Sequence, residues 1–215
     1  MVVARGKKKS PQVRDQVREQ NRAAYREAIL GAAERLFSER GFIGVRMSDV
    51  AAEAGLATGT LYNYFENKEE VLRSLIVMRG STLIQELQET FESERDAIAR
   101  IERMVTMAFA YIERHRAGYK MLVDSGPPEA MSRLCGGEVL EIQARYMGLF
   151  ENAMAAAVRA RRLRNKFPAK DLALFIAGAM DAMARTWIAS DDRTGLADKV
   201  GLVIELFLSG ASTKP

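Results

Sequence analysis

The chain has 215 residues, of which 48% are hydrophobic and 7% aromatic, which suits one small module and one larger domain of helices rich in Ala, Leu and Met. Cys135 is the only cysteine, which excludes an intrachain disulfide and a thiolate metal cluster. Residues 1–22 carry seven basic and two acidic side chains, and because the formal net charge of the whole chain is +4, the entire basic excess lies at the N-terminus.

The basic N-terminal arm, residues 1–21, has two interpretations. A flexible cationic segment binds a polyanion through counterion release, and the same composition also describes a solubilising tail. No apolar stretch follows Lys9, as a signal peptide would require, and no uninterrupted apolar run approaches the length needed to span a membrane. We therefore expect a cytoplasmic protein that does not associate with membranes.

The spacing of apolar residues predicts helices throughout the chain, and strand signals are weak. The first helix carries an apolar stripe and ends at Arg40, followed by Gly41 as a C′ glycine; its start can lie as early as Pro11. Two short helices are expected at about 47–54 and 58–65. Asn67 opens a fourth helix, with Glu70 completing a capping box, and this helix is expected to end near Gly80.

The remainder of the chain is also predicted to be helical. The expected helices cover about 81–93, 95–116, 137–164, 169–189 and 196–209, with loops at 124–128 and 191–195. This pattern predicts an all-α fold.

The span 47–65 has the features of a helix-turn-helix. Gly55 stands where the chain must turn sharply, and Leu61 and Phe65 fall on the inner face of the second short helix. The opposite face carries Gly59, Thr60 and Asn63, flanked by tyrosines at 62 and 64, so it offers short polar groups and phenols. An ordinary αα-corner with a polar exterior is the alternative interpretation.

This outer face has the chemistry that DNA recognition requires. Gly59 allows the backbone to approach the duplex, and Asn63 is able to bond both edge atoms of an adenine. Threonine and tyrosine hydroxyls donate to phosphate oxygens, and the charge of Lys68 at a helix start favours a phosphate. We therefore expect a DNA-binding module.

Residues 49–68 (DVAAEAGLATGTLYNYFENK) resemble the TetR family of bacterial regulators, and the specific match covers about residues 22–75. The resemblance implies an all-helical homodimer, usually a repressor, with a small-molecule pocket in its C-terminal domain. It divides the chain into the basic arm 1–21, a three-helix DNA-binding domain at 22–67 containing the helix-turn-helix, and a helical bundle for ligand binding and dimerisation at 68–215.

The sequence departs from the family pattern at two helix N-caps. Val45 and Ala57 stand where the family usually has Ser or Thr, and losing such a cap typically costs about 1 kcal/mol. We expect neighbouring residues to supply the missing phosphate contacts. The expected DNA-binding residues are Arg46, Ser48, Thr58, Gly59, Thr60, Tyr62, Asn63, Tyr64 and Lys68.

Methionines and aromatic residues are spread over the middle helices. Such side chains line adaptable pockets, and at helical spacing they also form plain hydrophobic core, so the pattern leaves both interpretations open. The expected ligand-pocket residues are Met104, Met107, Tyr111, Tyr119, Tyr146 and Phe150. The basic run 159–166 either attracts an anionic part of the ligand or is a solvated helix end.

The segment 169–189 is apolar around much of its circumference, which indicates burial on more than one side. With the family resemblance, this helix and the final one are the natural dimer interface, and a monomer core is the alternative. The expected interface residues are Phe175, Ala179, Met183, Trp187, Val203 and Phe207. Asp181 and Arg185, four residues apart, are expected to form an internal ion pair rather than intersubunit or ligand contacts.

The sequence therefore predicts a DNA-binding transcriptional regulator, a repressor released from its operator by a small hydrophobic effector. The alternative is an architectural or cell-cycle DNA-binding protein whose C-terminal domain binds another protein. An enzyme is not expected, because there is no Ser/His/Asp set, metal-ligand spacing or phosphate-binding glycine loop, and no cofactor or metal is implied.

Overall fold

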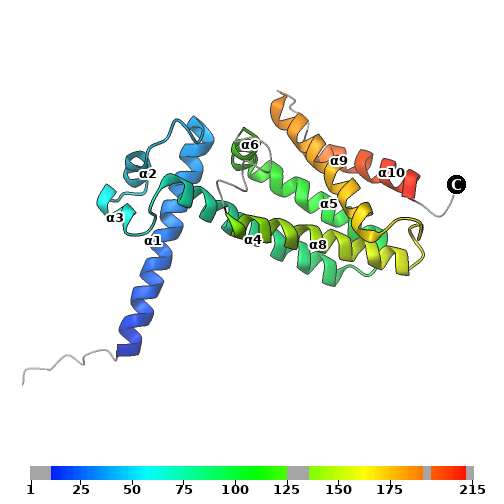
Figure 1. Ribbon diagram of the computed structural model, residues 1–215, viewed down its shortest axis with the longest axis horizontal. Helices are drawn as coiled ribbons and strands as arrows, with labels where there is room; N and C mark the ends of the chain where they lie inside the picture. Colours follow the sequence, from blue (N-terminus) through cyan, green and yellow to red (C-terminus); the bar gives the residue numbers. More distant parts are fainter. Residues whose placement is uncertain (1–10, 125–135, 191–194, 212–215) are drawn as a thin grey trace, which may run out of the picture. The chain divides into compact units, whose positions relative to one another are not determined.

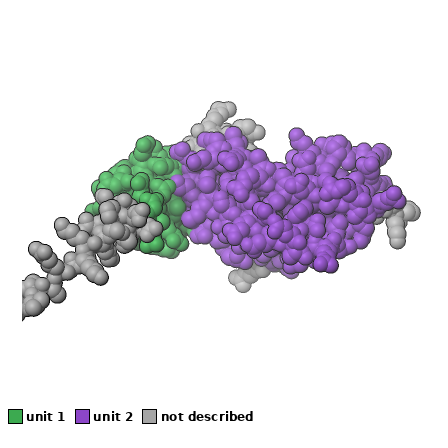
Figure 2. Space-filling view, turned by 90° about the horizontal axis from the view of Figure 1, so that it is seen from below, with its two compact units in different colours: residues 1–71 green, residues 72–215 purple. Residues whose placement is uncertain are grey.

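The computed structural model describes residues 11–124, 136–190 and 195–211, and these are helical with no β-strand among them (Figure 1). The predicted all-α fold is confirmed. The chain divides into two compact units, residues 1–71 and 72–215 (Figure 2). The basic residues at 5–9, the loop after Asp124, Cys135 and the turn at 191–194 lie outside the described residues.

The first unit is built on α1 (Pro11–Arg40), which begins with proline at its first position. The buried face of α1 carries Ile29, Ala32, Ala33, Leu36 and Phe37 of the predicted apolar stripe, whereas Tyr25, its first member, is 45% exposed. The helix ends where expected, because Gly41 takes a left-handed conformation with φ of 72°.

Two short helices complete the unit: α2 (Met47–Glu53) and α3 (Thr58–Tyr62). Between them Gly55 has φ of 70°, its N–H donates to the carbonyl of Ala52, and the N–H of Leu56 donates to the carbonyl of Ala51. These two hydrogen bonds form a Schellman motif, which makes the turn tight. The α3 helix is shorter than the predicted 58–65, because Asn63 is already its C-cap.

The helix α4 (Lys68–Ser93) is one continuous element, so the predicted break at Gly80 is wrong. Gly80 lies inside this helix, and the close approach of a neighbour accounts for the glycine: a Cβ at this position would lie 2.5 Å from Cγ2 of Ile142. Of the two hydrogen bonds of the capping box predicted at the start of α4, one is present. The N–H of Glu70 donates to Oδ1 of Asn67, but the Glu70 carboxylate accepts from the N–H of Glu66.

The second unit continues with α5 (Ala97–Arg114), α6 (Arg116–Asp124), α8 (Gly137–Arg159), α9 (Ala169–Ala189), the 3₁₀ turn η1 (Leu196–Lys199) and α10 (Val200–Ala211). Helix α6 was not predicted, and α8 stops at Arg159 rather than near position 164. It stops because Arg161 adopts a left-handed φ of 56°, and the N–H of Arg162 bonds the carbonyl of Ala157. This is again a Schellman end, with arginine where glycine is preferred.

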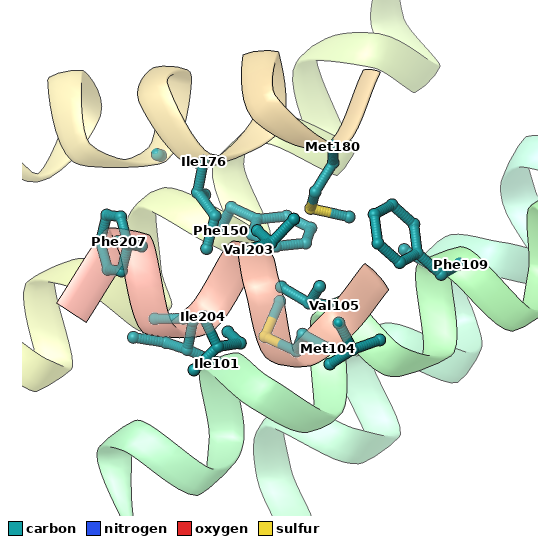
Figure 3. Close-up of a cluster of buried hydrophobic side chains, with 14 of the residues drawn as sticks. Ile101, Met104, Val105, Phe109, Phe150, Ile176, Met180, Val203, Ile204 and Phe207 are labelled. Atoms are coloured by element: carbon teal, nitrogen blue, oxygen red, sulfur yellow. The ribbon is translucent and has the colours of Figure 1, made fainter. Parts of the chain in front are cut away.

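The core of the second unit is formed mainly by side chains of α5, α8, α9 and α10, with Leu87 of α4 and Leu196 of η1 among them. Figure 3 shows Met104, Val105 and Phe109 of α5 directed toward Phe150, Ile176 and Met180, with Val203 and Phe207 of α10 closing the cluster. By length and composition α9 is apolar enough to cross a membrane, but its Leu172, Ile176 and Met180 side chains lie in this core. We therefore interpret α9 as a core helix.

Candidate functional site

The outer face of the helix-turn-helix is exposed and its inner face is buried. Leu61 and Phe65 are 0% and 1% exposed, whereas Tyr62 is 51% exposed. The other exposed positions are Thr58, Gly59 and Asn63, and Thr60 and Tyr64 are half-buried. The exposed face of α3 therefore consists of short polar groups, with the larger side chain of Tyr62 beside them.

Gly59 lies at the centre of this surface with open space around it. A Cβ built on Gly59 would meet no described atom within 4 Å, so packing inside the protein does not explain the missing side chain. A glycine inside a helix lowers stability relative to alanine. No packing contact within the described residues compensates for that loss at Gly59. The missing side chain leaves this stretch of backbone open to close approach by an external surface.

The start of α2 is capped without a Ser or Thr side chain. Arg46 rather than Val45 is the N-cap residue, and its N–H donates to Oδ2 of Asp49 at 2.8 Å. Val45 is 1% exposed and Val50 is 0% exposed, in the N′ and N4 positions of a hydrophobic staple. Arg46 and Ser48 are exposed at this helix start. Val45 is therefore an apolar anchor before the cap and not the cap itself, so the predicted loss of an N-cap at Val45 is wrong.

The C-terminal end of α3 is braced by α1. Nη1 of Arg26 donates to the carbonyl of Tyr64 at 3.0 Å, and the guanidinium lies 4.3 Å from the ring centroid of Phe65. The ring of Tyr25 contacts that of Tyr64, with centroids 5.8 Å apart. These contacts orient the segment that follows the outer face.

Lys68 does not present its ammonium to the outside. Its Nζ donates to the carbonyl oxygens of Phe42 at 2.6 Å, Val45 at 2.9 Å and Ile43 at 3.5 Å. An ammonium has three donors, so these bonds use its capacity. The sequence predicts that this charge favours a phosphate; in this structure the ammonium binds the α1–α2 turn.

The expected pocket residues divide into two groups. Met104 and Phe150 are both 0% exposed and belong to the core of the second unit. The other four, Met107, Tyr111, Tyr119 and Tyr146, are half-buried. The Tyr111 hydroxyl donates to the carbonyl of Arg79 at 2.6 Å, which joins α5 to α4.

A polar cluster links α6 to α9. Arg185 donates to Oδ2 of Asp181 at 2.7 Å, which confirms the predicted internal pair, and the Tyr119 hydroxyl donates to Oδ1 at 2.9 Å. Burial, and then the negative charge of Asp181, raise the pKa of Tyr119 and that of Tyr146. The hydrogen bond to Asp181 raises the pKa of Arg185. Both phenols are therefore neutral at physiological pH.

The expected dimer residues also divide. Trp187, Val203 and Phe207 are 8%, 3% and 3% exposed, so they pack within the protomer and leave little surface for a partner. Phe175 is 66% exposed, and Ala179 and Met183, at four-residue spacing from it, are half-buried. Sequence analysis missed the other exposed apolar residues of α9 and α10: Leu174, Leu202 and Leu206.

A tight α2–α3 corner with a small, polar, exposed outer face, joined to a separate helical unit, defines a helix-turn-helix DNA-binding transcriptional regulator. Residues 29–75, which contain this corner, match the family model described as bacterial regulatory proteins, tetR family, in agreement with the resemblance seen in the sequence.

Similar proteins are also regulators. The chain is 24% identical to the fatty acid metabolism regulator protein of Bacillus subtilis (strain 168), over 91% of this chain and 99% of that protein. It is 25% identical to the nucleoid occlusion factor SlmA of Vibrio cholerae, over 77% of this chain and 85% of that protein. Among solved structures, FadR from Bacillus subtilis in complex with stearoyl-CoA has the same fold, with a TM-score of 0.76, 22% identity, and coverage of 86% of this chain and 98% of that one.

Proposed function

We propose that this protein is a homodimeric, cytoplasmic repressor that binds operator DNA and is released by a small hydrophobic effector of the fatty acyl class. The open outer face of α3 around Gly59 is the observation that carries the DNA-binding role. Similarity over nearly the whole chain to a fatty acid metabolism regulator supports the effector class.

The proposed DNA contacts follow from exposure. Asn63 reads a base edge, Tyr62 and Thr58 donate to phosphates, and Arg46 and Ser48 contact the backbone from the start of α2. Thr60 and Tyr64 lie at the edges of the same surface, and Lys68 contributes by binding the α1–α2 turn rather than by contacting a phosphate. The basic arm adds affinity without sequence discrimination.

The proposed dimer forms through the exposed apolar face of α9 and α10. Phe175 and Leu206 are 66% and 62% exposed, an uncommon exposure for such large apolar side chains on adjacent helices. Pairing two copies of this helix pair gives a four-helix bundle, the usual solution for such a face. A Leu206→Glu variant should sediment as a monomer and lose operator binding, because one half-site alone binds weakly.

Effector binding in the second unit is proposed to involve the half-buried phenols and Met107. The Tyr119 hydroxyl donates to the carboxylate of Asp181, so an effector group that binds this carboxylate would compete with that hydrogen bond. Helix α4 begins in the first unit and continues into the second, so it is the proposed connector between effector and DNA. An effector that binds the DNA-incompetent arrangement more tightly shifts the population away from DNA.

The test begins with duplexes selected from a random library by the wild-type protein. Stearoyl-CoA, with free coenzyme A as the control, should raise the melting temperature and lower affinity for the selected duplex together. By linkage, the duplex must weaken stearoyl-CoA binding by the same factor. Two half-sites about 34–36 Å apart centre to centre are expected in the selected sequences, as for other dimeric helix-turn-helix proteins.

Two results would redirect this proposal. Failure to select any sequence would reject the DNA-binding role. If acyl compounds stabilise the protein and leave DNA affinity unchanged, the ligand switch is rejected, and an architectural or cell-cycle role takes its place. The similarity to a nucleoid occlusion factor makes that second role a specific candidate.

A further inference from the structure

The ammonium of Lys68 connects three carbonyls of the α1–α2 turn. In addition to the carbonyl oxygens of Phe42, Ile43 and Val45, it lies 4.4 Å from the ring centroid of Phe42. That ring contacts the ring of Phe37 edge-on at 5.3 Å, and Phe37 is 2% exposed. The ammonium of Lys68 therefore hydrogen-bonds the turn and also contacts the ring of Phe42, which packs against the core of the first unit.

The turn itself is tightly constrained. Gly41 has a left-handed φ of 72°, and a Cβ on Gly44 would lie 2.6 Å from the carbonyl oxygen of Arg40, so a side chain has no room there. Carbonyl dipoles that converge in such a turn repel one another, and a cation placed among them removes that repulsion. Lys68 supplies this cation, since its three donors are directed at three oxygens.

The turn leads directly into the DNA-facing start of α2. Lys68 holds the carbonyl of Val45, and the next peptide N–H, that of Arg46, is held by Asp49. The peptide between Val45 and Arg46 is thus held at its oxygen by α4 and at its nitrogen by α2. Its orientation determines where Arg46 and Ser48 project.

We propose that Lys68 is a positioning residue for DNA recognition: it orients the start of α2 by binding the turn before it and does not neutralise a phosphate. This inference rests on the proposed DNA-binding function. Because Lys68 is the first residue of α4 and its ammonium binds the α1–α2 turn, it also connects the start of α4 to the helix-turn-helix by hydrogen bonds.

Two substitutions separate positioning from phosphate contact. Lys68→Met keeps the length of the stem and removes the charge and donors. Lys68→Arg keeps the charge, but a planar guanidinium cannot direct three donors at three converging oxygens as an ammonium does. Arg46→Met, at an exposed position proposed to contact phosphate, is the positive control, and Lys170→Met, at an exposed position in α9, is the control for net charge.

Binding is measured for a duplex selected by the wild-type protein and for a scrambled duplex, over a range of salt concentrations and well below the melting transition of each variant. Lys68→Met should weaken binding to the selected duplex about tenfold, the scale of a charge-assisted hydrogen bond. The selected-to-scrambled affinity ratio should fall, and the salt slope should stay that of the wild type. Lys68→Arg should also lower the ratio, although its charge is retained.

Arg46→Met should instead make the salt slope shallower by about 0.9 per lost phosphate contact and weaken both duplexes alike. The same behaviour from Lys68→Met would overturn the proposal in favour of a phosphate contact. A lower melting temperature with unchanged affinity and ratio would overturn it in favour of a purely structural role. If Lys68→Met does not fold, wild-type binding by Lys68→Arg overturns the proposal. Failure of the wild-type protein to select a duplex would instead reject the proposed function itself.

Discussion

A methyl group at Gly59 should stabilise the protein and weaken its binding to DNA. A Cβ at this position meets no described atom within 4 Å, so Gly59→Ala introduces no clash inside the chain. Replacing a helical glycine by alanine stabilises a protein by about 0.5–1 kcal/mol, because the unfolded chain loses conformational freedom. If DNA approaches this backbone closely, the methyl group occupies space that the duplex needs, and affinity should fall at least about tenfold, which corresponds to roughly 1.4 kcal/mol.

The assay pairs urea unfolding, followed by far-ultraviolet circular dichroism, with a mobility-shift titration against a selected duplex. Gly148→Ala is the matched control: Gly148 is also helical, in α8, and a Cβ there also meets nothing within 4 Å. Both variants should unfold at higher urea, and only Gly59→Ala should lose DNA affinity. Affinity within twofold of wild type for Gly59→Ala would refute the reasoning that open space at α3 is reserved for the duplex.

Three further predictions concern stability. Arg161→Gly should stabilise the protein by about 1 kcal/mol in urea unfolding, because Arg161 has a left-handed φ of 56° that glycine adopts without strain. Gly80→Ala should destabilise it by about 1–3 kcal/mol, since its Cβ would lie 2.5 Å from Cγ2 of Ile142. In an Ile142→Ala background, which lacks Cγ2, the same change should cost less, and an undiminished loss there would contradict this side-chain clash. The carboxylate of Asp96 accepts a hydrogen bond from the N–H of Ala99, and this bond, together with Arg162, lowers the pKa of Asp96. The carboxylate therefore stabilises the fold fully above its unfolded-state pKa, and this contribution is lost as the pH falls through its folded-state pKa. The melting temperatures of wild type and Asp96→Ala should accordingly converge in acid and differ most near neutral pH.

The sequence was sufficient to predict the features that depend on a few neighbouring residues. The left-handed glycines at 41 and 55 mark helix ends by their own conformational freedom, and the spacing of Leu61 and Phe65 defines the inner face of α3. The pairing of Asp181 with Arg185 follows from four-residue spacing on one helix. Each of these is a short-range property, because a helix places residues three and four apart on the same side.

Only the tertiary structure decided how distant segments meet. Gly80 resembles a helix end in the sequence, yet it lies inside α4, where the close approach of Ile142, from a helix far along the chain, leaves no room for a side chain. The periodicity of α9 and α10 identifies apolar positions, but not which of them face the protomer core, as Trp187 and Phe207 do, and which remain exposed, as Phe175 does. Lys68 is the clearest case: its charge at a helix start favours a phosphate, and the fold brings three carbonyls from the α1–α2 turn within reach of its ammonium. A side chain bonds to the groups that the folded chain places nearest to it, and that proximity is set by packing between elements far apart in sequence.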